Sequence, residues 1–179
     1  LNVGCIPTKT LLRSAKAFHD ARMAGAYGVD LDADPTVNVA NMQERKGRVL
    51  TTLRKGVQDL LKKHEVDVVY GTASFENRST VKVNDETYEG KNVLIATGSR
   101  VGRPPISGID NKNVYDSSKI LEIDQVPESV VIIGAGIIGL EFAYLLNELG
   151  SDVTVLEMME RVAPALDSEI GKRLQQTLK

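Results

Sequence analysis

Apolar side chains recur every three or four positions in two stretches near the start of the chain. Residues 7–26 and 41–64 show this spacing, which predicts a pair of helices. Pro7 suits the first turn of the first helix, because its missing N–H would have no partner there. Gly47 and Gly56 weaken the second prediction, since glycine costs about 1 kcal/mol relative to alanine inside a helix. The seven Lys and Arg residues of the second stretch are interpreted as a solvated face rather than a binding patch.

Beyond residue 65 the period changes to two. Short alternating runs separated by turn residues predict an antiparallel meander, at residues 66–70, 72–75, 80–83 and 87–89. Residues 93–96 form a continuous apolar run instead. Such a run is typical of a strand buried on both faces.

Glycine and proline are frequent between residues 100 and 128, and we place a domain boundary near residue 110. After it the pattern predicts a strand at 130–133, a glycine loop at 134–139, a helix at 137–149 and a second strand at 153–156. A further helix begins at 167–179, with Asp167 or Ser168 as its cap. The predicted fold class is therefore α/β.

Composition excludes several classes of protein. The 179 residues are 42% hydrophobic and 26% charged, as in ordinary globular proteins. A net charge of −2 argues against nucleic-acid binding. The longest apolar run, Val130 to Leu140, is too short to span a bilayer. The chain lacks an initiator Met and a signal-peptide pattern and ends inside a predicted helix, so we expect a fragment of a longer protein.

The glycine loop matches the G-x-G-x-x-G pattern of dinucleotide-binding folds, with the residues Gly134, Ala135, Gly136, Ile137, Ile138 and Gly139. The first glycine permits the tight turn and the second lets a pyrophosphate approach the backbone. The third lets helix and strand pack closely. The N-terminus of the following helix offers N–H groups to the phosphates. A βαβ turn without a ligand is the less favoured alternative.

An acidic residue follows the second strand, as the dinucleotide pattern requires. Glu157 can accept hydrogen bonds from a ribose 2′-OH and would repel a 2′-phosphate, which favours NAD over NADP. Arg161, four residues later, is the one feature that argues for caution in this choice.

The single cysteine excludes an internal disulfide. Cys5 lies at the start of the first predicted helix, whose positive end favours a thiolate, and Lys9 is one turn further on. From position alone, a buried structural cysteine is an equally good interpretation. His19 and His64 are isolated, and we predict no metal site.

Residues 1–9, Leu-Asn-Val-Gly-Cys-Ile-Pro-Thr-Lys, resemble the redox-active segment of the flavoprotein disulfide reductases. Supporting similarities lie at residues 95–99, 116–118, 126–127 and 134–141. The resemblance is nearest to the members of the family that oxidise dihydrolipoamide. It implies that residues 1–110 are the latter part of an FAD-binding domain, with a helix pair, a three-stranded meander and a parallel strand. Residues 111–179 would begin a Rossmann-like NAD-binding domain.

The resemblance also implies roles for individual residues. Cys5 would be the second cysteine of the redox pair, the one nearer the flavin, and the first would precede Leu1. Lys9 would lie beside the flavin ring and Glu141 would pair with it. The remaining implied FAD contacts are Gly71, Thr97, Gly98 and Ser99. Without the resemblance, these residues are ordinary helix or strand-end positions.

The implied activity is oxidation of dihydrolipoamide with FAD and NAD, on lipoyl domains of 2-oxo acid dehydrogenase complexes. The implied parent is a homodimer in a bacterial cytoplasm or a mitochondrial matrix. The upstream FAD fingerprint and the dimerisation domain with its His–Glu pair are absent, so we expect the fragment to be inactive alone. The alternatives are another disulfide or mercuric reductase of this family, a non-catalytic NAD-binding module and an assembly subunit.

Overall fold

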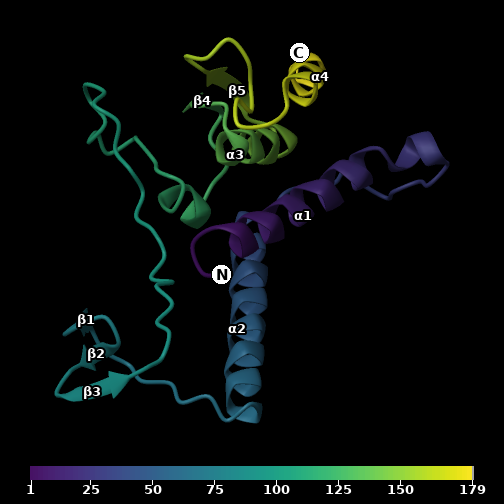
Figure 1. The fold of residues 1–179 in the computed structure, drawn as a ribbon. Coiled ribbons are helices and arrows are strands. Elements are labelled where there is room, and N and C mark those ends of the chain that lie inside the picture. Colours follow the sequence, from purple (N-terminus) through teal and green to yellow (C-terminus); the bar gives the residue numbers. More distant parts are fainter. Residues whose placement is uncertain (179) are drawn as a thin grey trace. The chain divides into compact units, whose positions relative to one another are not determined.

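The computed structural model describes residues 1–178 as two compact units. The first unit combines Leu1–Thr52 with the chain from Pro105 onward, and the second is Leu53–Pro104. Figure 1 shows the elements in chain order. The units are described separately below, and the proposed domain boundary near residue 110 stays a prediction.

The helix pair predicted at the start of the chain is present. Helix α1 spans Cys5–Arg22 and is followed by a short 3₁₀ helix, η1, at Ala24–Tyr27. It begins two residues earlier than predicted, at Cys5 itself, because Pro7 is accommodated within its first turn. Helix α2 spans Val39–Lys63 without interruption at its two glycines. The side-chain oxygen of Asn38 accepts a hydrogen bond from the N–H of Asn41 at 2.9 Å, which caps the start of this helix.

The predicted meander forms three strands in the second unit. Strands β1 (Ala73–Phe75), β2 (Thr80–Val83) and β3 (Glu86–Glu89) pair antiparallel in the order β1-β2-β3. The side chain of Asn77 accepts hydrogen bonds from the N–H groups of Ser79 and Thr80 at 3.0 Å, which shapes the first turn. The alternating run at 66–70 is not a strand in the structure.

The prediction of a strand buried on both faces at residues 93–96 is wrong for this chain. Leu94 and Ile95 are 88% and 68% exposed, and the segment carries no strand pairing. A strand is held by its ladder of hydrogen bonds, and this segment pairs with none of the strands of residues 1–178. An apolar run indicates a tendency to form a strand, whereas pairing needs a neighbour.

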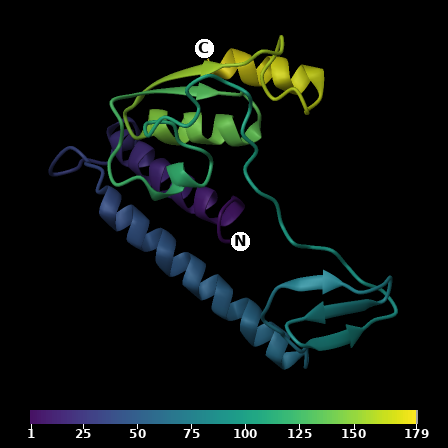
Figure 2. The same ribbon diagram turned by 90° about the vertical axis from the view of Figure 1, so that its left-hand side faces the viewer.

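The first unit contains the predicted strand–loop–helix–strand order. Strand β4 (Ser129–Ile133) pairs in parallel with β5 (Asp152–Leu156), and helix α3 (Ile137–Glu148) connects them. In Figures 1 and 2, α3 lies between this strand pair and α1. Helix α4 (Ser168–Thr177) follows, and its cap Asp167 accepts from the N–H of Glu169. The part of this prediction at residue 179 lies outside the described residues.

Two apolar clusters hold the first unit together. The larger joins α1, the 3₁₀ helix η2 (Lys119–Glu122) and α3, through Leu11, Ala15, Leu121, Phe142, Leu145 and Leu149. The smaller is formed by Ala135, Leu140 and Ala163, with Leu174 of α4 packed against it. The cores therefore hold α1, which carries Cys5, and the glycine loop in the same unit. The α/β fold class is confirmed.

Candidate nucleotide-binding and redox site

The structure requires glycine at two of the three glycine positions of the 134–139 loop. Gly134 has φ +106°, which favours glycine strongly. A Cβ at Gly139 would lie 2.0 Å from the carbonyl oxygen of Gly134, so only glycine allows this approach of α3 to the loop. Gly136 faces open space within 4 Å. Space of this kind is what a bound pyrophosphate would need.

Helix α3 begins directly at the loop. Gly136 is its cap, and the exposed Ile137 and Ile138 are its first two residues. The N–H groups of a first helical turn have no partner inside the helix. This end of α3 can therefore donate hydrogen bonds to an anion, and the helix dipole would favour it.

The segment after β5 holds the glycine loop in place. Ala135 is fully buried, and its N–H donates to Oε2 of Glu157 at 2.7 Å. Its carbonyl oxygen accepts from the N–H of Ala163, also at 2.7 Å. Both the N–H and the carbonyl oxygen of this buried residue are thus hydrogen-bonded to the 157–163 segment.

The carboxylate of Glu157 is fixed by backbone donors. Besides Ala135, the N–H of Met159 donates to its Oε1 at 2.9 Å. These bonds, first that of Met159 and then that of Ala135, hold the pKa of Glu157 below its ordinary value. The acid predicted to bind ribose is therefore a charged acceptor at the loop. Its contact with a ribose stays a prediction.

Arg161 belongs to the structure of the same segment. Its guanidinium donates to the carbonyl oxygens of Leu166 and Pro164, each at 3.0 Å. The sequence suggested only a donor for a 2′-phosphate at this position. Its bonds to backbone carbonyls could not be predicted from the sequence, because they depend on how residues 163–166 turn.

The predicted redox residues lie on α1. Cys5 is exposed and is the first residue of the helix, and Lys9 follows one turn later. The ammonium of Lys9 donates to Oε1 of Glu141 on α3. Glu141 is two residues beyond Gly139, so this ion pair links the helix of the cysteine to the helix of the nucleotide loop. The two residues are 132 positions apart in the chain.

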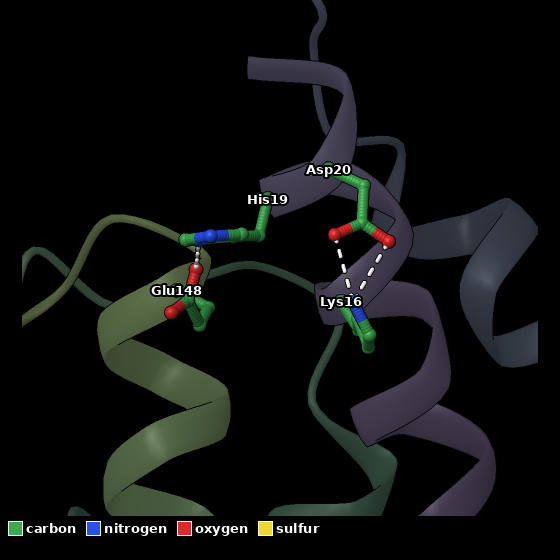
Figure 3. A network of polar contacts seen from close by, with 4 residues as sticks. All are labelled: Lys16, His19, Asp20 and Glu148. Carbon is green, nitrogen blue, oxygen red and sulfur yellow. Dashed lines mark hydrogen bonds and ion pairs between the residues drawn. The ribbon is translucent and has the colours of Figure 1, made fainter. Parts of the chain in front are cut away.

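A second polar contact links the other ends of α1 and α3. His19 Nδ1 lies 2.7 Å from Oε2 of Glu148, as Figure 3 shows. Beside it, the ammonium of Lys16 donates to both carboxylate oxygens of Asp20 at 2.8 and 2.9 Å. This bond lowers the pKa of Asp20. No local pattern predicts the His19 contact, because its partner is 129 positions away.

The other predicted FAD contacts lie in the second unit. A Cβ at Gly71 would lie 2.7 Å from Asn84 Oδ1 and Val83 Cγ1, so a larger residue there would force these two side chains to move. Gly98 has φ +77°, in the region that favours glycine. Its neighbours Thr97 and Ser99 are exposed. Their role in FAD binding stays a prediction.

Residues 1–178 contain neither a candidate metal site nor a helix that could cross a membrane. No group of three or more His, Cys, Asp or Glu side chains there could hold a metal ion. Of the helices in this range, none has the length and apolar character needed to cross a membrane.

Within the first unit, a parallel strand pair with a glycine loop is joined by an ion pair to a cysteine-bearing helix. Residues 1–179 match the family model described as "Pyridine nucleotide-disulphide oxidoreductase", and the chain belongs to this family. Family membership implies the use of a flavin and a pyridine nucleotide.

Curated relatives and solved structures agree with this assignment. The chain is 40% identical to the dihydrolipoyl dehydrogenases of Acholeplasma laidlawii and Bacillus subtilis, over 100% and 99% of its length. It is 43% identical to that of Trypanosoma brucei brucei, over 100% of its length. It covers 54%, 40% and 39% of these three proteins, and so spans about half of their length or less.

The solved structure of the HOCl-induced flavoprotein disulfide reductase RclA from Escherichia coli is similar to this chain. The TM-score is 0.78 at 31% identity, over 99% of this chain and 37% of RclA. The same protein as a Cu(II) complex gives a TM-score of 0.76 at 32% identity.

Proposed function

We propose that these residues are the redox and nucleotide-binding part of a dihydrolipoyl dehydrogenase. The observation that carries the proposal is the Lys9–Glu141 ion pair, which connects the cysteine helix to the nucleotide-loop helix within one unit. The relatives named above support the choice of substrate.

The reaction of the whole protein would move two electrons from a dithiol to a nucleotide. Dihydrolipoamide gives up two electrons and two protons and becomes the cyclic disulfide. NAD gains a hydride, and one proton is released to solvent. FAD would supply the two-electron chemistry between dithiol and nucleotide. Cys5, paired with a cysteine before Leu1, would accept the electrons of the dithiol.

The described residues fit both cofactors at specific points. For NAD, open space at Gly136, the first turn of α3 and the fixed carboxylate of Glu157 suit a pyrophosphate and a ribose. For FAD, Lys9 offers a cation one turn from the exposed thiol of Cys5. Glu141 would orient that cation, because its carboxylate is only one-quarter exposed and accepts from Lys9.

The partners and setting follow from the same proposal. The substrate is dihydrolipoamide on lipoyl domains of 2-oxo acid dehydrogenase complexes, and the whole protein is a homodimer. A bacterial cytoplasm or a mitochondrial matrix, where thiols stay reduced, suits this chemistry.

The test is an assay of the full-length flavoprotein with dihydrolipoamide and NAD, followed by NADH absorbance. We expect activity in the wild type and a loss of about a thousandfold or more in Cys5→Ser, because serine cannot form the disulfide. Ser74→Ala, an exposed small polar residue of β1, is the matched control and keeps full activity. Full activity of Cys5→Ser would refute the proposal.

A second candidate is a disulfide reductase for another substrate. The similarity to RclA, a flavoprotein disulfide reductase induced by HOCl, favours it. The same assay distinguishes the two functions. NADH consumption with other disulfides but no oxidation of dihydrolipoamide would select the second candidate.

A further inference from the structure

The backbone at Ala163 adopts a conformation that alanine disfavours. Its φ is +47°, in the left-handed region, and only 1% of the residue is exposed. A residue with a Cβ disfavours this conformation, so surrounding contacts must maintain it. The turn matters because the N–H of Ala163 bonds the carbonyl of Ala135 in the glycine loop.

Arg161 supplies such contacts on the far side of the turn. One terminal nitrogen of its guanidinium donates to the carbonyl of Leu166 and the other to that of Pro164. Helix α4 closes over the same side chain. A Cβ at Gly171 would lie 3.1 Å from Nη1 of Arg161 and 3.0 Å from the carbonyl of Val162. The planar fork of Arg161, which precedes Ala163, therefore bonds two carbonyls that follow it in the chain.

We propose that Arg161 is a positioning residue for the dinucleotide. It maintains the Ala163 turn, the turn holds the carbonyl of Ala135, and the glycine loop is thereby preformed for the pyrophosphate. Both terminal nitrogens donate to carbonyls of Arg161's own segment, so we assign this side chain to the turn rather than to a 2′-phosphate. The choice of NAD over NADP then rests on Glu157. This inference rests on the proposed function, since it takes NAD as the ligand of the loop.

The test measures NADH binding to the full-length flavoprotein directly, by fluorescence titration, and compares wild type with Arg161→Met. Apparent Kd is the intrinsic value divided by the fraction of molecules in the competent state. A loop that is correctly formed about one tenth of the time therefore binds roughly tenfold more weakly. Arg173→Met is the matched control, because Arg173 is exposed on α4, and its Kd stays that of the wild type.

A purely structural role for Arg161 would change other readouts. We expect flavin content, kcat and the KM for dihydrolipoamide to stay at wild-type values in Arg161→Met while the KM for NAD rises. Arg161→Lys, which can reach one carbonyl, gives an intermediate Kd. If Arg161→Met does not fold as a flavoprotein, Arg161→Lys carries the test alone, with an expected rise of about threefold.

Three results would overturn the proposal. The first is an NADH Kd of Arg161→Met, or of Arg161→Lys if that variant alone folds, within the error of the wild type. The second is a selective loss of NADPH binding, which would make Arg161 a 2′-phosphate receptor. The third is a wild type that does not bind NADH. A wild type that binds NADH but does not oxidise dihydrolipoamide refutes the proposed function instead, and the Kd comparison still decides the role of Arg161.

Discussion

Replacing Gly139 by alanine should destabilise the folded nucleotide-binding unit itself, and not only weaken the binding of its ligand. The added Cβ would lie 2.0 Å from the carbonyl oxygen of Gly134, 3.2 Å from its carbonyl carbon and 3.4 Å from Ile132 Cγ2. The first of these neighbours is backbone of a loop that is bonded on both sides. It cannot move away as a flexible side chain would. Helix α3 would have to move away from this loop.

The size of the effect follows from the severity of this contact. Overpacking a well-packed core typically costs about 1–3 kcal/mol, and a clash with backbone belongs at or above the upper end. We therefore expect a loss of about 3 kcal/mol or more. With a urea m-value of about 3 kcal/mol/M, the unfolding midpoint should fall by roughly 1 M or more.

Gly136→Ala is the informative comparison, because it adds the same methyl group to the same loop. Gly136 has φ −72° and nothing within 4 Å of an added Cβ, so its unfolding midpoint should stay unchanged. Its NADH affinity should fall instead, since the methyl group would occupy the space proposed for the pyrophosphate. Urea unfolding and NADH titration of both full-length variants make the test. Equal midpoints for Gly139→Ala and wild type would refute the packing argument.

Three further predictions concern the charged contacts of the first unit. The pKa of Glu157 is lowered by two backbone donors. Its contribution to the stability of the folded state is therefore complete above its ordinary pKa of 4.5, and is lost as the pH falls through its lower pKa in the folded state. Urea midpoints of Glu157→Gln should thus depend less on pH than those of the wild type in this acidic range. Glu141→Gln should lower turnover about tenfold or more by releasing Lys9, yet change stability by less than about 1 kcal/mol, because Lys9 is more than half exposed. A double-mutant cycle of His19→Ala and Glu148→Ala should give a coupling of about 1 kcal/mol or less, measured by urea unfolding at neutral pH.

The Lys16–Asp20 pair provides the control for these ion-pair variants. It lies on the exposed face of α1 and bridges one helical turn only. Lys16→Gln should leave turnover unchanged. A loss of turnover equal to that of Glu141→Gln would mean that any change of charge on this unit impairs activity.

A Glu157→Gln profile with the pH dependence of the wild type would contradict the assigned cause of its lowered pKa.

The sequence predicted those elements whose determinants are local. The glycine loop, its flanking strands and α3 follow from a short pattern of glycines and apolar residues, and the structure confirms them. The meander was predicted for the same reason. The run at 93–96 was not a strand, because pairing depends on a neighbour that a local pattern does not contain.

The candidate site shows the same division. Glu157 could be selected from its spacing after Gly139, whereas its bond to Ala135 requires knowledge of the turn. The pairing of Lys9 with Glu141 came only from resemblance to a family, since 132 positions separate them. The bonds of Arg161 to Pro164 and Leu166 could not be predicted, because nothing in the surrounding sequence shows that Ala163 has a positive φ.

The two backbone hydrogen bonds of Ala135 make opening of the glycine loop measurable without any ligand. Its amide hydrogen is held by a carboxylate, and the amide of Ala163 is held by the carbonyl of Ala135. Both amides can exchange with deuterated solvent only when the two segments separate, so exchange at these positions reports the free energy of that opening. In the wild type and its variants alike, exchange of these two backbone hydrogens measures how often the glycine loop separates from the 157–163 segment.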